Sequence, residues 1–182
     1  MNDIYGKQYL KEANKRYNLT LQFIKKHINQ DSRILDIGVK SYLTELISKE
    51  GYNTISSPEN IDYDLEFDFV KNDQVDVVTA FEILEHLVSP FPLLKNIKAP
   101  FLIASIPLKL WFAKAYWNEN DPFDRHYHEF EPKQFDMLLN KAGWTIVDSQ
   151  KWVYPINKIG IRPLLRFFYP RYYIVFAKKS ES

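Results

Sequence analysis

The chain has 182 residues, 46% of them hydrophobic, with a net charge of +1 and no cysteine. This length fits one domain with a sizeable core, and the missing cysteines exclude disulfides and thiolate metal sites. The balanced charge argues against nucleic acid as a partner, because nucleic-acid binding usually shows as a basic excess. The N-terminus is too polar for a secretory signal, and no run of about 18 apolar residues predicts a membrane span. We therefore expect a cytoplasmic protein.

The first third of the chain predicts a helix followed by a strand, a helix and a strand. Apolar residues recur at spacings of three and four over 7–29, which is typical of one face of a helix. Residues 33–38, an apolar run that stops at a glycine, predict a buried parallel strand. Residues 44–50 suit a short helix that Gly51 closes, and 52–56 read as a second strand.

The middle of the chain predicts three further strands. The acidic segment 58–69 predicts one brief strand, and 75–81, rich in Val and Thr, gives the clearest strand signal in the chain. The chain turns helical from Glu82, prolines break that helix, and 92–98 form another short helical piece. Residues 101–106 then read as the fifth strand.

The last third begins with a long aromatic connection over 107–130. A helix is predicted over 132–141, with proline in its first turn and glycine after its end. Two strands follow over 144–152 and 172–178, without a convincing helix between them, so we expect an antiparallel pair at the sheet edge. Alternating strands and helices predict an α/β fold with a mostly parallel sheet.

Three segments resemble class I S-adenosylmethionine (SAM)-dependent methyltransferases. Residues 34–38 (ILDIG) resemble motif I of that family, and 75–86 (VDVVTAFEILEH) resemble its fourth strand and following helix. Residues 138–147 (LLNKAGWTIV) resemble its late helix and sixth strand. The three segments occur in the same order along the chain as in that family.

The resemblance implies a Rossmann-like, seven-stranded, mostly parallel sheet with helices on both faces and the last strand antiparallel. It implies one methyltransferase-like domain over 1–182, with 1–30 as an N-terminal helix and 31–178 as the core. The implied function is SAM-dependent transfer of a methyl group to a small-molecule, sugar or lipid-linked acceptor, at a hydroxyl.

The first loop departs from the family pattern D-x-G-x-G-x-G. Here it reads Asp36-Ile-Gly38-Val-Lys40-Ser-Tyr42, so only the first glycine is present. A Cβ atom at such positions crowds a ligand or forbids a positive φ angle, so we expect Lys40 and Tyr42 to obstruct SAM. The alternative function is a catalytically silent methyltransferase-fold protein that binds a partner or another ligand.

Further cofactor-binding residues follow from the resemblance. An acid at the end of the second strand usually holds the ribose hydroxyls, and the candidates are Ser57 and Glu59, with Glu59 the better acceptor. Asp64 stands before a leucine, where the family's acid would accept from the adenine amine. Seven acids occur from Glu59 to Asp76, both included, so a solvated acidic loop is the alternative. The implied cofactor-binding set is Asp36, Gly38, Glu59, Asp64, Phe81 and Glu82.

A metal-binding site is the next candidate functional feature. Glu82, Glu85 and His86 have the spacing i, i+3, i+4, which places them on one face of a helix. Two carboxylates and an imidazole can bind Mg²⁺, Mn²⁺ or Zn²⁺. The chain resembles the ubiquinone-biosynthesis and small-RNA O-methyltransferases here, and the second family's H-x-F-E setting implies His128, and not His126, as a fourth ligand.

A catalytic role is the alternative for these histidines. Neutral imidazole is well placed in pKa to take a proton from a hydroxyl, so His86 and His128 are candidate general bases.

The aromatic connection is interpreted as a lid over the acceptor, with core packing and a homodimer contact as alternatives. Residues 155–171 are basic and apolar with no acid, which favours phosphate-bearing carriers or a peripheral membrane contact, or else a solvated face.

Overall fold

The computed structural model describes residues 7–153 and 160–180. Within them one sheet of six strands has the order β2-β1-β3-β4-β6-β5. The strands are β1 (Arg33–Ile37), β2 (Asn53–Ser56), β3 (Val77–Phe81), β4 (Phe101–Pro107), β5 (Trp144–Val153) and β6 (Pro170–Lys179). The helices are α1 (Lys7–His27), α2 (Tyr42–Lys49), α3 (Pro90–Asn96), α4 (Pro132–Lys141) and α5 (Ile161–Phe168), with 3-10 turns η1 (Asp68–Lys71) and η2 (Leu84–His86).

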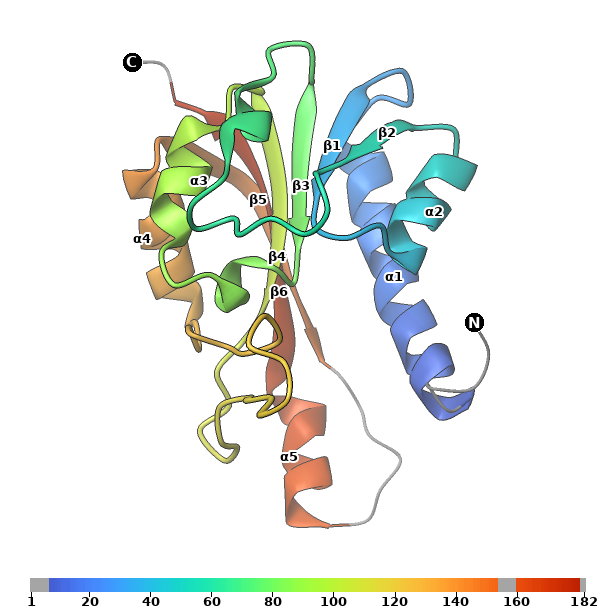
Figure 1. The fold of residues 1–182 in the computed structure, drawn as a ribbon. Coiled ribbons are helices and arrows are strands. Elements are labelled where there is room, and N and C mark those ends of the chain that lie inside the picture. The colour runs from blue at the N-terminus through green and yellow to red at the C-terminus, as the bar shows by residue number, and fades with distance from the viewer. Residues whose placement is uncertain (1–6, 154–159, 181–182) are drawn as a thin grey trace.

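The expected α/β architecture is confirmed. Strands β1 to β4 pair in parallel, and β6 runs antiparallel to both β4 and β5. Helices α1 and α2 cover one face of the sheet, and α3 and α4 cover the other (Figure 1). The central strands read as continuous apolar runs because both of their faces are buried.

The prediction of a brief strand in 58–69 is wrong. The sheet therefore has six strands, and not seven, in the described part of the chain. The segment forms turns and then η1. The carboxylate of Asp62 accepts a hydrogen bond from the backbone N–H of Asp64, at 2.9 Å. Such a side-chain bond favours a turn over an extended strand.

Two predicted connections also differ. The chain after β3 forms only the three-residue turn η2, and not the helix expected from Glu82 onward. Glu82 itself has a φ of 54°, in the left-handed region, whereas residues of a right-handed helix have a negative φ. Helix α5 lies between β5 and β6, where no helix was predicted. No described helix has both the length and the apolar character needed to cross a membrane.

The carboxyl ends of the parallel strands meet at one edge of the sheet. The loops after β1 and β3 begin there, and so does the aromatic connection after β4. In Figure 1 this edge lies at the bottom, with the connection and α5 below it. Ligands in open α/β sheets bind at this edge, so it is where the candidate site is built.

Candidate functional site

The loop after β1 forms the first wall of the site. Gly38 has a φ of 129°, and a Cβ atom added there would meet nothing within 4 Å, so the backbone borders open space. Asp36 lies buried beneath the loop, where its carboxylate accepts hydrogen bonds from Thr44 at 2.7 Å and Thr79 at 2.6 Å. Burial raises the pKa of Asp36, against the effect of the two hydroxyl bonds. Asp36 therefore ties β1 to α2 and β3.

Ser57, and not Glu59, lies against this loop. The Ser57 hydroxyl accepts from the backbone N–H of Gly38 at 2.9 Å and lies 2.8 Å from the Tyr63 hydroxyl. Glu59 is exposed and lines none of the cavities at this edge. The position where an acid was expected thus carries a serine that fixes the glycine backbone.

Two adjoining cavities lie beside the loop. The smaller, of about 270 Å³, is bounded by Asp36, Gly38, Phe81 and Glu82, among others. The larger, of about 620 Å³, lies toward α3. Both are lined by Val39, Ile83, His86 and Phe123.

Lys40 and Tyr42 line neither cavity, so the obstruction expected from their side chains is not seen. Val39 and Ser41 are the loop side chains that reach the space. Both Lys40 and Tyr42 are exposed, and the Tyr42 ring lies 6.0 Å from that of Tyr17 on α1.

Asp64 lines the larger cavity together with Asp62. The two carboxylate oxygens of Asp64 accept hydrogen bonds from the backbone N–H groups of Val88 and Ser89, at 2.8 and 2.7 Å. Asp64 therefore ties this loop to the start of α3. Asp62 and Asp64 together make one wall of the larger cavity acidic.

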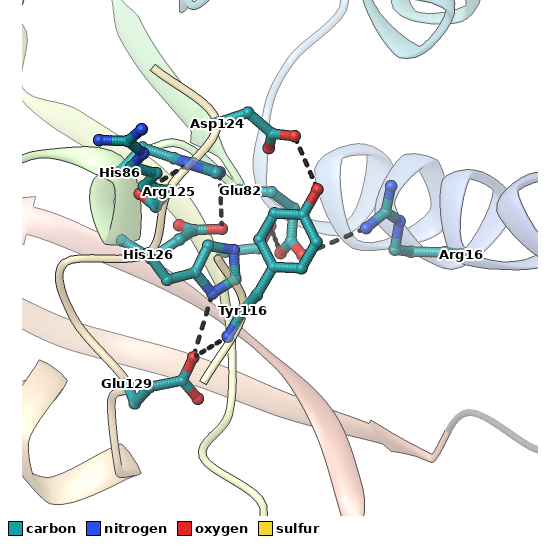
Figure 2. A network of polar contacts seen from close by, with 10 residues as sticks. Arg16, Glu82, His86, Tyr116, Asp124, Arg125, His126 and Glu129 are labelled. Atoms are coloured by element: carbon teal, nitrogen blue, oxygen red, sulfur yellow. Dashed lines mark hydrogen bonds and ion pairs between the residues drawn. The ribbon is translucent and has the colours of Figure 1, made fainter. Parts of the chain in front are cut away.

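Glu82 occupies the end of β3 in a strained backbone conformation. One of its carboxylate oxygens accepts from the Ser105 hydroxyl at 3.0 Å, and the other from the Arg16 guanidinium at 3.1 Å. Burial raises the pKa of Glu82, and the charge of Arg16 opposes that rise. Figure 2 shows the pair bridging α1 and the sheet edge.

Glu85 is the most deeply buried acid of the site, with 1% of its surface exposed. Its Oε2 has no hydrogen-bond partner, and its Oε1 lies 3.8 Å from Nε2 of His86. Burial first, and then the charge of Glu82, raise the pKa of Glu85 well above its ordinary value. Burial, together with neighbouring His126, lowers the pKa of His86. This corner of the site therefore favours a neutral carboxyl beside a neutral imidazole.

His126, and not His128, joins this group. The rings of His86 and His126 meet edge to face with centroids 4.8 Å apart. Nδ1 of His126 lies 3.3 Å from a carboxylate oxygen of Glu129 (Figure 2). His128 instead bonds to the backbone carbonyl of Val88 and lines neither of the two cavities described above.

The predicted metal set is consequently not assembled. Glu85, His86 and His126 form the group of described residues whose ligand atoms lie within 4.8 Å of one another. Glu82 and His128 are outside that group. The two carboxylate oxygens of Glu82 accept from Arg16 and Ser105 instead. The helical face assumed for the motif does not exist, because Glu82 is not helical and η2 is a single turn.

A third cavity, of about 360 Å³, lies on the far side of His126. Its walls come from the aromatic connection, α5 and the start of β6. It is lined by Lys114, Tyr116, Trp117, His126, Arg166 and Arg171, among others. Glu129 is the acid among its lining residues, and its carboxylate already accepts from the backbone N–H of Tyr116. This cavity has a basic lining that suits an anionic group.

The sequence interpretation missed Arg16 and His126, and it did not bring Arg166 and Arg171 together in one cavity. The sequence marks the segment 155–171 as basic. The orientation of Arg166, however, is set by helix α5, which was not predicted. For His126, the available signal was Glu129 three residues later, a spacing that lets the two side chains pair. Nothing in the sequence marks Arg16, because it comes from a helix outside the sheet.

The sheet and its edge define the fold of class I SAM-dependent methyltransferases. No protein-family model matches the chain, and no curated protein sequence matches it. The chain is similar in structure to the Burkholderia thailandensis 1,6-didemethyltoxoflavin-N1-methyltransferase with bound 1,6-didemethyltoxoflavin and S-adenosylhomocysteine. The TM-score is 0.63 and the identity 18%, over 91% of this chain and 78% of that one.

Two other solved structures show the breadth of this fold. A SAM-dependent methyltransferase from Archaeoglobus fulgidus matches with a TM-score of 0.58 and 19% identity, over 95% of this chain and 100% of that one. The [4+2]-cyclase SpnF matches with a TM-score of 0.54 and 13% identity, over 91% and 82%. The fold is thus shared with an enzyme described by another reaction, and function must be argued from the site.

Proposed function

We propose that the chain transfers a methyl group from SAM to a hydroxyl of a small molecule that carries an anionic group. One observation carries the proposal. The His86–His126 pair lies between a cavity bordered by Gly38 and a cavity bordered by Arg166 and Arg171. A cofactor on one side and an acceptor on the other would meet at these imidazoles.

The residues around the first two cavities fit SAM. Gly38 leaves room for close approach of a ligand to the backbone. The carboxylates of Asp62 and Asp64 suit the nucleoside end, where hydroxyl and amine donors need acceptors. Phe81 and Glu82 border the smaller cavity, where a carboxylate suits the cationic amino group of the methionine part.

SAM, when bound, supplies a methyl group on a positively charged sulfur. We assign the acceptor's proton to Nε2 of His126, because its Nδ1 faces Glu129 and a hydrogen bond there leaves Nε2 as the acceptor. His86 faces the carbonyl of Arg125 with its own Nδ1, and burial lowers its pKa, which favours the neutral imidazole beside the cofactor cavity. This assignment needs no metal.

The third cavity is proposed as the acceptor site. Arg166 and Arg171 present guanidinium groups, which bind carboxylates and phosphates in a planar, two-pronged geometry. Tyr116 and Trp117 add aromatic surface for a ring or a sugar face. Sugar phosphates, lipid-linked phosphates and aromatic carboxylates share this chemistry.

The alternative is a catalytically silent protein of the same fold. Two observations favour it: the single glycine of the first loop, and Ser57 where a ribose-binding acid was expected. Isothermal titration with SAM and with S-adenosylhomocysteine separates the two functions. Saturable heat supports the enzyme, and no heat from folded protein supports the silent alternative.

A pair of matched variants tests where SAM binds. Gly38 and Gly143 both have positive φ, at 129° and 89°, and both have open space where a Cβ would lie. Gly38→Ala and Gly143→Ala therefore both force a Cβ onto a positive-φ backbone, which costs more than about 1 kcal/mol in each variant. We expect only Gly38→Ala to weaken SAM binding, by about tenfold or more. Equal affinities in the two variants would place SAM elsewhere.

A further inference from the structure

Helix α5 presents its apolar side away from the protein. Ile161, Leu164 and Phe168 recur at spacings of three and four, so they share one face of the helix, and they are between 58% and 79% exposed. Arg166 lies on another side and lines the third cavity. A surface helix normally turns its apolar face to the core and its charges to solvent. In α5 this arrangement is reversed.

The aromatic connection extends the apolar surface. Trp111 is 68% exposed, and its ring contacts those of Phe112 and Tyr169 with centroids 5.4 and 6.2 Å apart. We call the exposed side chains of Trp111, Ile161, Leu164, Phe167 and Phe168 the α5 patch. No described α5 side chain belongs to either core cluster, and α5 lies beyond the sheet edge in Figure 1.

The charge around the α5 patch identifies its occupant. From Lys151 to Arg171, the segment that contains α5, the sequence has five Lys or Arg residues and no Asp or Glu. A second copy docking through the same face would bring two such basic surfaces together, which is repulsive. An anionic bilayer offers both an apolar interior and negative headgroups, and tryptophan favours its interface.

We propose that the α5 patch docks the protein onto an anionic membrane surface. The apolar side chains enter the boundary between headgroups and acyl chains, and the basic segment lies against the negative headgroups. Arg166 of the same helix lines the third cavity. The proposal holds whether or not the chain transfers methyl groups.

Co-sedimentation of the whole chain with vesicles tests the proposal. The probe is phosphatidylcholine with about one quarter phosphatidylserine, against phosphatidylcholine alone. We expect binding to the anionic vesicles that weakens as salt rises, because salt screens the headgroup charge. Absence of binding, or equal binding to the neutral vesicles, would overturn the proposal.

Variants locate the surface. Leu164→Ser with Phe168→Ser should lower vesicle affinity by about tenfold or more. The double variant loses two apolar side chains that would insert into the bilayer, and its charge is unchanged. Met137→Ser is the matched control, since Met137 is 63% exposed on helix α4. All three residues are exposed, so melting temperatures should stay close to that of the unmutated chain. Equal loss in the Met137 control, or no loss in the double variant, would contradict the assignment.

Two further measurements distinguish a membrane from a second copy of the chain as the occupant of the α5 patch. Brominated lipid should quench the tryptophan fluorescence of the unmutated chain, and Trp111→Phe should remove most of that quenching. Sedimentation velocity without lipid should give the same mass for the unmutated chain and the double variant. A dimer that the double variant converts to monomer would assign the α5 patch to a second copy and overturn the membrane proposal.

Discussion

The guanidinium of Arg16 lies 3.1 Å from the carboxylate of Glu82, across 66 residues of sequence. Arg16 comes from α1, and Glu82 ends β3 with a φ of 54°. The Arg16 guanidinium also lies over the rings of Tyr17 and Tyr172, at 5.2 and 4.9 Å from their centroids. The N-terminal helix therefore holds an acid of the candidate cofactor site in place.

Replacing Arg16 should destabilise the fold. Arg16→Met leaves the partly buried carboxylate of Glu82 without its cationic partner, and we expect the free energy of unfolding to fall by about 1–3 kcal/mol. Urea unfolding of Arg16→Met, Glu82→Gln and the double variant gives the coupling energy. Strictly additive effects would mean that the ion pair contributes nothing.

The ionisation of Glu85 should make stability depend on pH. Its pKa is raised well above 4.5 in the folded protein, by burial and by the charge of Glu82. Its stabilising contribution is complete below the unfolded pKa and declines as pH rises toward the folded pKa, by at most about 1.4 kcal/mol per pH unit. Arg16, His86 and Glu129 also face this carboxyl.

Glu85→Gln removes this titration. We expect the variant to gain stability relative to the unmutated chain as pH rises from about 4.5, measured by urea unfolding at several pH values. The amide keeps the size of the side chain and cannot ionise. Two parallel pH profiles would show that Glu85 ionises in the folded state as readily as in the unfolded state.

Removing the side chains of Lys40 and Tyr42 should leave SAM affinity almost unchanged. The sequence pattern predicts that they crowd the ligand, but neither lines a cavity at the sheet edge. Titration of Lys40→Ala with Tyr42→Ala should give a dissociation constant within about threefold of the unmutated value. Marked tightening would restore the interpretation in which these side chains obstruct the site.

The two histidines of the sequence HYH should differ in importance. We expect His126→Gln to slow methyl transfer by about a hundredfold or more, as loss of a general base does. His128→Gln should change it little, because His128 bonds to the Val88 carbonyl and does not itself line any of the three cavities. The assay follows labelled methyl from SAM into a panel of hydroxylated carboxylates and sugar phosphates. Equal losses in both variants would reject the assignment of His126.

The order of the elements was readable from the sequence. Buried parallel strands are continuous apolar runs, so β1, β3 and β4 stand out, and proline and glycine mark the ends of α4. These signals are local, because hydrogen bonding and burial of a strand or helix leave a periodicity in its own residues. The end of β1 directly before Gly38 was also predicted from the sequence.

The composition of the site was decided by tertiary structure. Helical spacing predicted that Glu82, Glu85 and His86 converge, but the left-handed backbone at Glu82 sends that side chain to Arg16 and Ser105. His126 replaces His128 beside Glu85 and His86 because the aromatic connection folds back over η2, with the Tyr127 and His128 N–H groups bonded to the Glu85 carbonyl. Contacts between distant segments depend on where each loop turns in space, and a local sequence pattern carries no record of that.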